Sequence, residues 1–478
     1  MNGEVKVLAF DFGASSGRAI LAGFEDGCLS YREVHRFENV PVEKNGHLCW
    51  NFPMLLSEVR KGIDKAGSFS SVGFDTWGVD FGLLDAEGNL LGDPVHYRDA
   101  RTAGLVEKAF QIMDAGTLYA KTGTQILNIN TLFQLLAIKE QQPDLLIQAK
   151  TLLFMPDLFS YMVSGMPVCE QSIASTGQLL NLSTGEWSSE VRDAFCLPKE
   201  IFLRPVKSGT VTGTLENGAA VIAVAGHDTQ CAVAAIPAQN EDVVFLSCGT
   251  WSLLGTELDA PILTEQSLTL NLSNELGANG KINYLKNIIG LWLIQESRRA
   301  WRRKGEEYSY ADLERLALEA KPFQSFVDPD ASEFVPQGDI PARVQEYCRK
   351  SGQIVPQTVG EVMRCIYESL VLKYRFAVNQ LKEATGKRFS ALHVLGGGAK
   401  DNLLCQMSAD STGLPVVAGP VEATALGNII IQLVALGELS DISAGRALIA
   451  KTETLRHYTP ANTDLWDKAY ETYKTILK

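Results

Sequence analysis

The chain has 478 residues, of which 46% are hydrophobic and 21% are charged, and its formal net charge is −13 at pH 7. A single hydrophobic core stops growing near roughly 250–300 residues, so this length predicts two large domains. The acidic balance argues against non-specific binding to nucleic acid, and no run approaches the roughly 20 apolar residues that a membrane span needs.

Short apolar strands and turns alternate from the start of the chain. Apolar runs predict strands over residues 5–10, 18–24 and 31–37, and helical spacing of apolar side chains predicts a helix over 53–66. Residues 71–84, SVGFDTWGVDFGLL, predict a buried strand, a turn and a second strand.

The middle of the chain repeats the opening pattern. Residues 219–226, AAVIAVAG, predict an apolar strand that ends in glycine, and the HDTQCAVAAI segment behind it predicts a helix. Residues 241–252, EDVVFLSCGTWS, predict an apolar strand that runs into a hydroxyl-bearing turn, as residues 5–16 do. This echo predicts two halves of similar topology, 1–238 and 239–478.

The last third of the chain continues the alternation of helices and strands. Residues 359–381 carry an apolar stripe typical of a long helix, with Gly386 as its terminator. A strand follows at 391–395, before the glycines 396–398, and residues 415–418 with GPVEATALGN repeat the strand–loop–helix pattern. The alternation predicts an α/β fold.

The cysteines and the N-terminus predict the compartment. The 9 cysteines are scattered without a CxxC pair, so we expect free thiols in a reducing compartment. The 6 histidines show neither i, i+4 spacing nor a cysteine cluster, which disfavours a zinc site. No basic segment precedes the first strand, so we expect no signal peptide and a cytoplasmic protein.

Four turns rich in Gly, Ser and Thr follow apolar strands: GASSGR, SCGTWS, GGGAKDN and GPVEATALGN. The GxxxxGK[ST] and GxGxxG motifs are missing, which disfavours the two commonest nucleotide-binding folds. Backbone N–H groups in small-residue turns bind anions without a lysine, although each turn alone is also typical of a simple connection. Within the first turn, Asp11 either caps the next element or holds a metal beside a bound anion.

The GHDT segment at 226–229 places an acid just past a buried strand, where a helix is predicted to begin. Asp228 is the best candidate for a general base that takes a proton from a bound hydroxyl. The alternative is structural, because Asp228 or Thr229 at this position is also typical of a helix N-cap.

The DTWGVDF segment raises similar alternatives. Asp75 and Asp80 around Gly78 suit a polyol whose hydroxyls donate to the acids, while Trp77 covers its apolar face. The alternative is an edge hairpin with a core tryptophan. The charged residues of YRDAR, 97–101, form either a surface ion pair or a wall of the same pocket.

Taken in order, these motifs resemble the FGGY carbohydrate kinases of the actin-like ATPase superfamily. The resemblance is carried by DFGASSGR, DTWGVDF, YRDAR, MPDLFSY, GHDT, LSCGTWSL, LKNIIGLWLIQ, LGGG and GPVEATALGN, which span nearly the whole chain. It implies two ribonuclease H-like domains with an interdomain cleft, and ATP and Mg²⁺ as cofactors.

The resemblance also implies a set of site residues. Asp11 would lie near the magnesium, and Asp228 would be the base. The residues that would contact ATP are Ala14, Ser15, Ser16, Gly17, Arg18, Thr250, Gln295 and Gly397. The residues that would face the sugar are Gly78, His227, Asp228, Thr229 and Asn287.

DTWGVDF and KNIIGLWLIQ are specific to one branch of the family. That branch implies phosphorylation of the ketose L-rhamnulose at O1, to L-rhamnulose 1-phosphate. A kinase for fuculose or xylulose is the alternative, and an actin-like ATPase without kinase activity is a second alternative that DTWGVDF beside GHDT argues against. Two segments, SNELGANG (273–280) and GGGAKDN (396–402), depart from the usual pattern of the branch.

Overall fold

The computed structural model of the chain describes residues 4–238, 240 and 242–477. The chain divides into two compact units, each assembled from separated stretches of sequence. The predicted boundary at Gln239 and the predicted strand start at Glu241 lie outside the described residues. The first unit combines Met1–Gln239, Glu257–Tyr284 and Ala423–Thr452, and the second combines Asn240–Thr256, Leu285–Glu422 and Glu453–Lys478.

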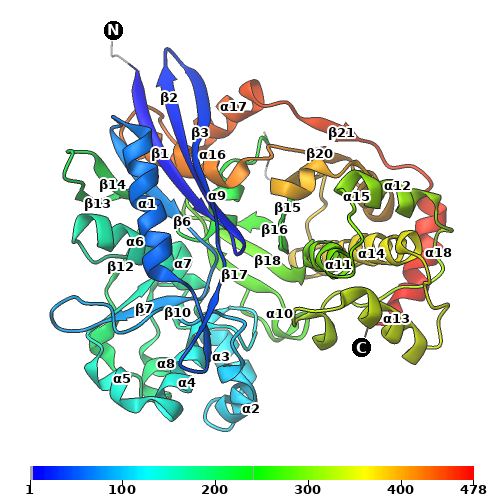
Figure 1. Cartoon of the computed structure of the whole chain (residues 1–478), viewed down its shortest axis with the longest axis horizontal. Coiled ribbons are helices and arrows are strands. Elements are labelled where there is room, and N and C mark those ends of the chain that lie inside the picture. Colours follow the sequence, from blue (N-terminus) through cyan, green and yellow to red (C-terminus); the bar gives the residue numbers. More distant parts are fainter. Residues whose placement is uncertain (1–3, 239, 241, 478) are drawn as a thin grey trace. The chain divides into compact units, whose positions relative to one another are not determined.

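The first unit is built on one mixed sheet. Its strands, in order across the sheet, are β13 (Thr210–Thr214), β14 (Ala220–Ala223), β6 (Ser71–Asp75), β1 (Val5–Phe12), β2 (Ser16–Glu25) and β3 (Cys28–Glu38) (Figure 1). β1, β2 and β3 are antiparallel to one another in turn, whereas β6 is parallel to β1 and β14 is parallel to β6. The strands predicted at 5–10, 18–24 and 31–37 are therefore confirmed.

The first unit also contains twelve α-helices and nine short strands among the described residues. Its helices are α1 (Phe52–Ala66), α2 (Leu105–Phe110), α3 (Ala115–Thr122), α4 (Thr131–Gln141), α5 (Pro143–Gln148), α6 (Met155–Ser164), α7 (Gln171–Ser175), α8 (Ser189–Ala194), α9 (Asp228–Ala234), α10 (Glu265–Thr269), α16 (Ala423–Ala435) and α17 (Ile442–Thr452). Its short strands are β4 (Val42–Lys44), β5 (His47–Cys49), β7 (Phe81–Leu84), β8 (Thr151–Phe154), β9 (Cys169–Glu170), β10 (Leu180–Asn181), β11 (Glu186–Trp187), β12 (Pro205–Val206) and β17 (Ser273–Leu276).

Helices α1 and α16 cover opposite faces of the sheet. A Cβ on Gly62 of α1 would lie 2.7 Å from the Phe10 ring, and a Cβ on Gly73 of β6 would lie 2.7 Å from Asn428 Oδ1 of α16. Gly73 pairs with Ala9. Since successive residues of a strand point to opposite faces, Phe10 faces α1 while Ala9 and Gly73 face α16.

Helix α16 also packs against α9, the helix that begins at Asp228. A Cβ on Gly427 of α16 would lie only 1.8 Å from the Cys231 carbonyl oxygen of α9. The two backbones are therefore closer together than any residue other than glycine would allow. This contact, together with the sheet, fixes the position of α9.

The second unit has its own sheet and helices. The strands of this sheet lie in the order β17, β18 (Ile282–Ile289), β16 (Trp251–Leu258), β15 (Val243–Cys248), β19 (Ala391–Leu395), β20 (Val416–Ala418) and β21 (Arg456–Tyr458), of which β17 and the first residues of β18 are assigned to the first unit. The helices of the second unit are α11 (Trp292–Arg303), α12 (Tyr310–Glu319), α13 (Ile340–Lys350), α14 (Val359–Thr385), α15 (Asn402–Thr412) and α18 (Thr463–Lys474).

The two units repeat one strand pattern, as the sequence echo predicted. In the first unit an antiparallel hairpin, β1–β2, is followed by the parallel strands β6 and β14. In the second unit the hairpin β15–β16 is followed by the parallel strands β19 and β20. The mixed α/β class is confirmed.

The long helix α14 begins and ends where local chemistry dictates. Thr358 and Glu361 form a reciprocal capping box at its N-terminus. Gly386, at φ 69°, closes its C-terminus in the left-handed conformation, so the predicted terminator is confirmed.

Throughout the described part of the chain, no helix combines the length and the apolar character that a bilayer crossing requires.

Candidate active site

The GASSGR segment forms the tight hairpin between β1 and β2. Gly13 N donates to Ser16 O at 2.9 Å. Across the hairpin, Arg18 Nε and Nη2 lie 3.0 and 2.6 Å from Asp11 Oδ2, so the predicted metal-binding carboxylate is paired with a guanidinium. The predicted phosphate-binding residues divide between the turn, with Ala14 and Ser15, and the start of β2, with Ser16, Gly17 and Arg18.

Three carboxylates gather at the carboxyl ends of the parallel strands of the first unit. Asp11 of β1 is the register partner of Asp75 of β6. The chain just after β6 is bonded to the start of α9, since Asp228 N donates to Thr76 O at 2.8 Å. Asp11 and Asp75 therefore lie at the ends of two neighbouring strands, and Asp228 begins the helix that follows β14.

Asp75 is fully buried and only half satisfied. Its Oδ2 accepts from Asn428 Nδ2 at 2.7 Å, whereas Oδ1 has no hydrogen-bond partner among the described residues. Burial, followed by the charges of Asp11 and Asp228, raises the pKa of Asp75 well above its ordinary value. Asp75 therefore favours its protonated, neutral form beside the ion pair of Asp11 and Arg18.

Asp228 stands at the first turn of α9 and keeps 31% of its side chain exposed. Burial, opposed by His227 and assisted by Asp11, raises its pKa to about 6. The N-cap of α9 is His227, whose side chain makes no capping hydrogen bond, so the N-cap interpretation of Asp228 or Thr229 is wrong. Asp228 Oδ1 accepts from Thr229 N at 2.6 Å and from Thr229 Oγ1 at 3.3 Å.

The DTWGVDF segment leaves β6 in a loop held from several sides. Val79 has φ 66°, a strained value for a β-branched residue. Its N–H donates to Thr176 Oγ1 at 3.0 Å and its carbonyl accepts from Thr131 Oγ1 at 2.7 Å. A Cβ on Gly78 would lie 3.2 Å from Thr176, so a larger residue would require Thr176 to shift by a few tenths of an ångström.

The acids and the indole of this loop point mostly into the core. Trp77 is 6% exposed, and its ring centroid lies 3.9 Å from that of Trp50. Asp80 Oδ2 accepts from both indole N–H groups, at 3.0 and 2.7 Å, and from Tyr97 N at 3.1 Å, while Oδ1 accepts from Gln134 Nε2 at 2.9 Å. The core interpretation of the tryptophan holds, but β7 pairs with β8 and not with β6, so the hairpin interpretation is wrong.

The YRDAR segment is bonded to the chain around it, and Asp99 Oδ1 lies 3.1 Å from His47 Nδ1. Asp99 accepts the backbone amides of Leu48 and Arg101 at 2.8 and 3.0 Å. Arg101 Nη2 donates to Gln134 Oε1 at 2.7 Å, and Gln134 is the residue that bonds Asp80. The segment therefore supports the loop that carries Gly78 through the hydrogen bonds of Gln134.

In the second unit, the structure brings three predicted nucleotide residues together. Thr250 Oγ1 lies 3.4 Å from Gln295 Oε1 of α11. A Cβ on Gly398 would lie 2.3 Å from Cys248 Sγ, so the triple-glycine turn that contains Gly397 rests on the strand end just before Thr250. Asn287, a predicted sugar residue, lies on β18 in this unit, whereas Gly78, His227, Asp228 and Thr229 belong to the first.

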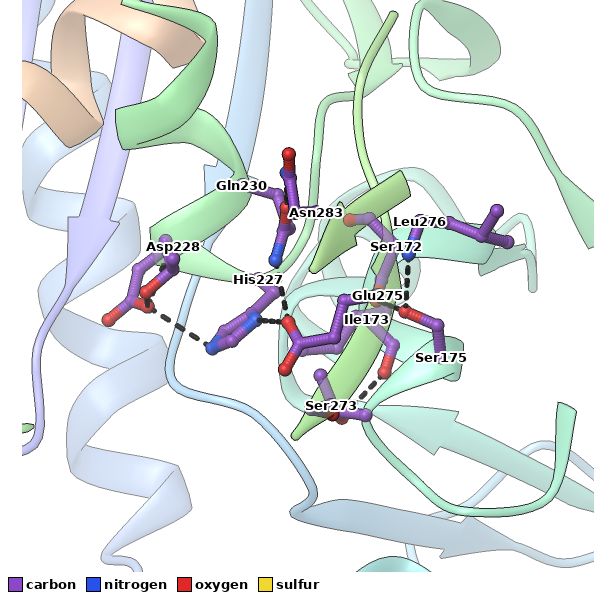
Figure 2. A network of polar contacts seen from close by, with 12 residues as sticks. Ser172, Ile173, Ser175, His227, Asp228, Gln230, Ser273, Glu275, Leu276 and Asn283 are labelled. Carbon is purple, nitrogen blue, oxygen red and sulfur yellow. Dashed lines mark hydrogen bonds and ion pairs between the residues drawn. The ribbon is translucent and has the colours of Figure 1, made fainter. Parts of the chain in front are cut away.

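One acid that contacts His227, the neighbour of Asp228, was not predicted from the sequence (Figure 2). Glu275 Oε2, on β17, lies 2.8 Å from His227 Nδ1 and accepts from Gln230 Nε2 at 2.6 Å. A single acid inside the four-residue buried strand SNEL was the available signal. Asn428 was also missed, although the GPVEATALGN turn that carries it was singled out.

Sequence comparison defines the class. The N-terminal domain of the FGGY family of carbohydrate kinases matches residues 6–240, and its C-terminal domain matches residues 244–436. The chain belongs to the FGGY family of carbohydrate kinases, and the predicted class of two ribonuclease H-like domains is confirmed. It is 42% identical over 484 residues to the Rhamnulokinase of Bacteroides thetaiotaomicron, in an alignment that covers 98% of this chain and 99% of that protein.

Solved structures share the fold at low identity. The gluconate kinase from Lactobacillus acidophilus superimposes with a TM-score of 0.80 at 17% identity, over 99% of this chain and 98% of that one. A ligand-bound xylulose kinase from the same organism gives a TM-score of 0.78 at 16% identity, over 98% and 97% of the two chains. Plasmodium falciparum glycerol kinase with ADP gives a TM-score of 0.77 at 15% identity, over 99% of this chain and 98% of that one.

Proposed function

We propose that this carbohydrate kinase uses ATP to phosphorylate L-rhamnulose at O1, giving L-rhamnulose 1-phosphate and ADP. The observation that carries the proposal is the 42% identity to a Rhamnulokinase over 98% of the chain. At similar coverage, the gluconate and xylulose kinases reach only 17% and 16% identity. The choice of ketose follows from that difference.

The arrangement around Asp228 supports this chemistry. The sugar O1 attacks the γ-phosphorus, the bond between that phosphorus and the β–γ bridging oxygen breaks, and the proton from O1 passes to the Asp228 carboxylate. With a pKa of about 6, Asp228 is ionised at neutral pH and remains basic enough to take the proton. The partial exposure of its side chain leaves the carboxylate open to a bound hydroxyl.

The remaining site residues keep the roles that family membership suggests. Gly78, His227, Thr229 and Asn287 are proposed to bind the sugar. Asp228 joins them as the base. The nucleotide is proposed to contact Ala14, Ser15, Ser16, Gly17, Arg18, Thr250, Gln295 and Gly397, of which Thr250, Gln295 and the Gly397 turn lie together in the second unit.

Two carboxylates of the first unit, Asp11 and Asp75, would offer oxygens to a divalent cation. Asp75 Oδ1 is buried without a hydrogen-bond partner among the described residues, and Asp11 is the carboxylate next to the proposed phosphate turn. Among those residues, no group of three or more His, Cys, Asp or Glu side chains is placed so that it could hold a metal ion. Asp11 would therefore hold Mg²⁺ with oxygens from ATP and water, and the ion would neutralise charge on the transferred phosphoryl group.

The proposal is tested by coupled measurement of ADP release. L-Rhamnulose, L-fuculose and D-xylulose are compared as acceptors, with gluconate and glycerol as outgroup acceptors. We expect the highest kcat/KM with L-rhamnulose and a phosphorus NMR signal of a primary phosphate ester in the product. A higher kcat/KM with fuculose or xylulose would overturn the choice of sugar, and ADP release that no sugar stimulates would overturn the kinase assignment.

A further inference from the structure

The imidazole of His227 lies between two carboxylates (Figure 2). Its Nδ1 is 2.8 Å from Glu275 Oε2, and its Nε2 is 3.4 Å from Asp228 Oδ1. His227 is 7% exposed and Glu275 is 3% exposed. Solvent therefore competes little for the hydrogen bonds of the imidazole, and both ring nitrogens face an acceptor.

Glu275 is held rigidly as an acceptor. Gln230 Nε2 donates to the same Oε2 at 2.6 Å, and Gln230 Oε1 in turn accepts from Asn283 Nδ2. The strand that carries Glu275 is anchored by Ser175 Oγ, which accepts from Leu276 N at 3.0 Å. Because these contacts fix Glu275, they also fix the ring that it binds.

The hydrogen bonds of Asp228 distinguish its two oxygens. Thr229 N and Thr229 Oγ1 both donate to Oδ1, and His227 Nε2 faces the same atom. Among the described residues no donor is bonded to Oδ2. The geometry therefore leaves Oδ2 as the oxygen that can receive a proton from a sugar hydroxyl.

We propose that Glu275 is a positioning residue that acts through His227: it holds the imidazole protonated, with Nε2–H directed at Asp228 Oδ1, so that Oδ2 serves as the base. The inference rests on the proposed function and adds Glu275 to it. In the reaction the O1–H bond breaks, the proton binds Oδ2, and the imidazolium keeps both of its protons.

The electrostatics around His227 support this arrangement. Burial by itself lowers the pKa of His227, but the carboxylates of Glu275, Asp228 and Glu170 outweigh it and hold that pKa above its ordinary value. The imidazolium in turn lowers the pKa of Asp228 and so keeps the base ionised. The charged groups that act on the His227–Asp228 pair are Glu275 of β17, Glu170 of β9, Asp75 of β6 and Asp11 of β1.

The test is the pH profile of Glu275→Gln. Glutamine keeps the size of the side chain and one acceptor oxygen, but it removes the charge that keeps His227 protonated. The pKa of Asp228 then rises, so the acidic limb of kcat should move up by about one pH unit. From a starting pKa of about 6, kcat should fall about twofold at pH 7 and about tenfold at pH 5, with sugar KM within about threefold. At higher pH the variant should recover toward the wild-type kcat.

A matched control is Glu368→Gln in the second unit. Glu368 is also buried, and it bonds Arg364 and the Phe323 amide instead of any residue of the site. The control should leave the acidic limb where it is in the wild type. A Glu275→Gln profile that is lowered equally at every pH, with no shift, would overturn the inference and leave the proposed function intact, because wild-type activity on L-rhamnulose tests that function separately.

A second measurement does not depend on the fold of the variant. Nitrogen-15 NMR of histidine-labelled wild-type protein reports the protonation of each ring, and His227→Asn assigns the signal. We expect both ring nitrogens of His227 to carry protons at pH 7. A neutral His227 ring at that pH in the wild type would overturn the inference.

Discussion

Replacing Asp228 by asparagine tests the base directly. Asparagine keeps the shape of the side chain and an oxygen that can accept from the Thr229 amide, so α9 should begin as before. It cannot take a proton. Because the pKa of Asp228 is about 6, roughly nine-tenths of the wild-type carboxyl groups are ionised and active at pH 7.

The expected loss follows from the role of that carboxylate. General-base help contributes about 10²–10⁴ to the rate, equivalent to about 3–5 kcal/mol of transition-state stabilisation. We therefore expect kcat to fall by that factor, while the dissociation constant for the sugar changes by less than about threefold. The wild type should lose kcat below about pH 6, since a protonated Asp228 cannot accept the sugar proton.

The assay is ADP release with L-rhamnulose, combined with calorimetry for sugar affinity and a thermal melt. Asp441→Asn is the matched control, because Asp441 Oδ1 also accepts an amide at a helix start, from Ala444 N at 2.8 Å, and is exposed. It should keep wild-type kcat. A folded Asp228→Asn enzyme whose kcat stays within about tenfold of wild type would remove Asp228 from the catalytic role.

Three further changes have definite expected outcomes. Gly398→Ala puts a Cβ 2.3 Å from Cys248 Sγ, so it should raise the KM for ATP at least about fivefold with little change in sugar KM. A variant whose KM for ATP equals that of the wild type would contradict this packing argument. Excess chelator should abolish turnover and added Mg²⁺ should restore it; full turnover in chelator would exclude the role of Asp11 as a metal ligand. Asp80→Ala leaves buried donors unpaired, at about 1–3 kcal/mol each, and should lower the melting temperature by about 5 °C or more; an unchanged melt would show that the donors find other partners.

The elements predicted from local pattern are those whose cause is local. The apolar run at 5–10 became β1, and the stripe at 359–381 became α14, which continues to Thr385 because nothing before Gly386 stops it. The echo between 5–16 and 241–252 indicated the repeated strand pattern correctly. In each case neighbouring residues in sequence supply the information.

What the sequence did not reveal depends on distant partners. Glu275 is 48 residues from His227, and its acceptor role becomes visible only when β17 lies beside α9. The partner of Asp75, Asn428, is 353 residues away. In the sequence alone, Trp77 suits contact with a sugar as well as it suits a hydrophobic core. Only its packing against Trp50 in the structure distinguishes these two roles. A periodic pattern within about a dozen residues cannot predict contacts between residues so far apart in the sequence.

The contact of Gly427 with the Cys231 carbonyl has a consequence for the order of folding. The first unit begins with β1, yet α16, which covers its sheet and braces α9, comes from Ala423–Ala435. Synthesis proceeds from the N-terminus, so the helix that carries Asp228 waits for about 190 further residues before its neighbour exists. We therefore expect that the first unit cannot mature on the ribosome ahead of the second, and that nascent chains expose an uncovered apolar sheet face until translation is nearly complete.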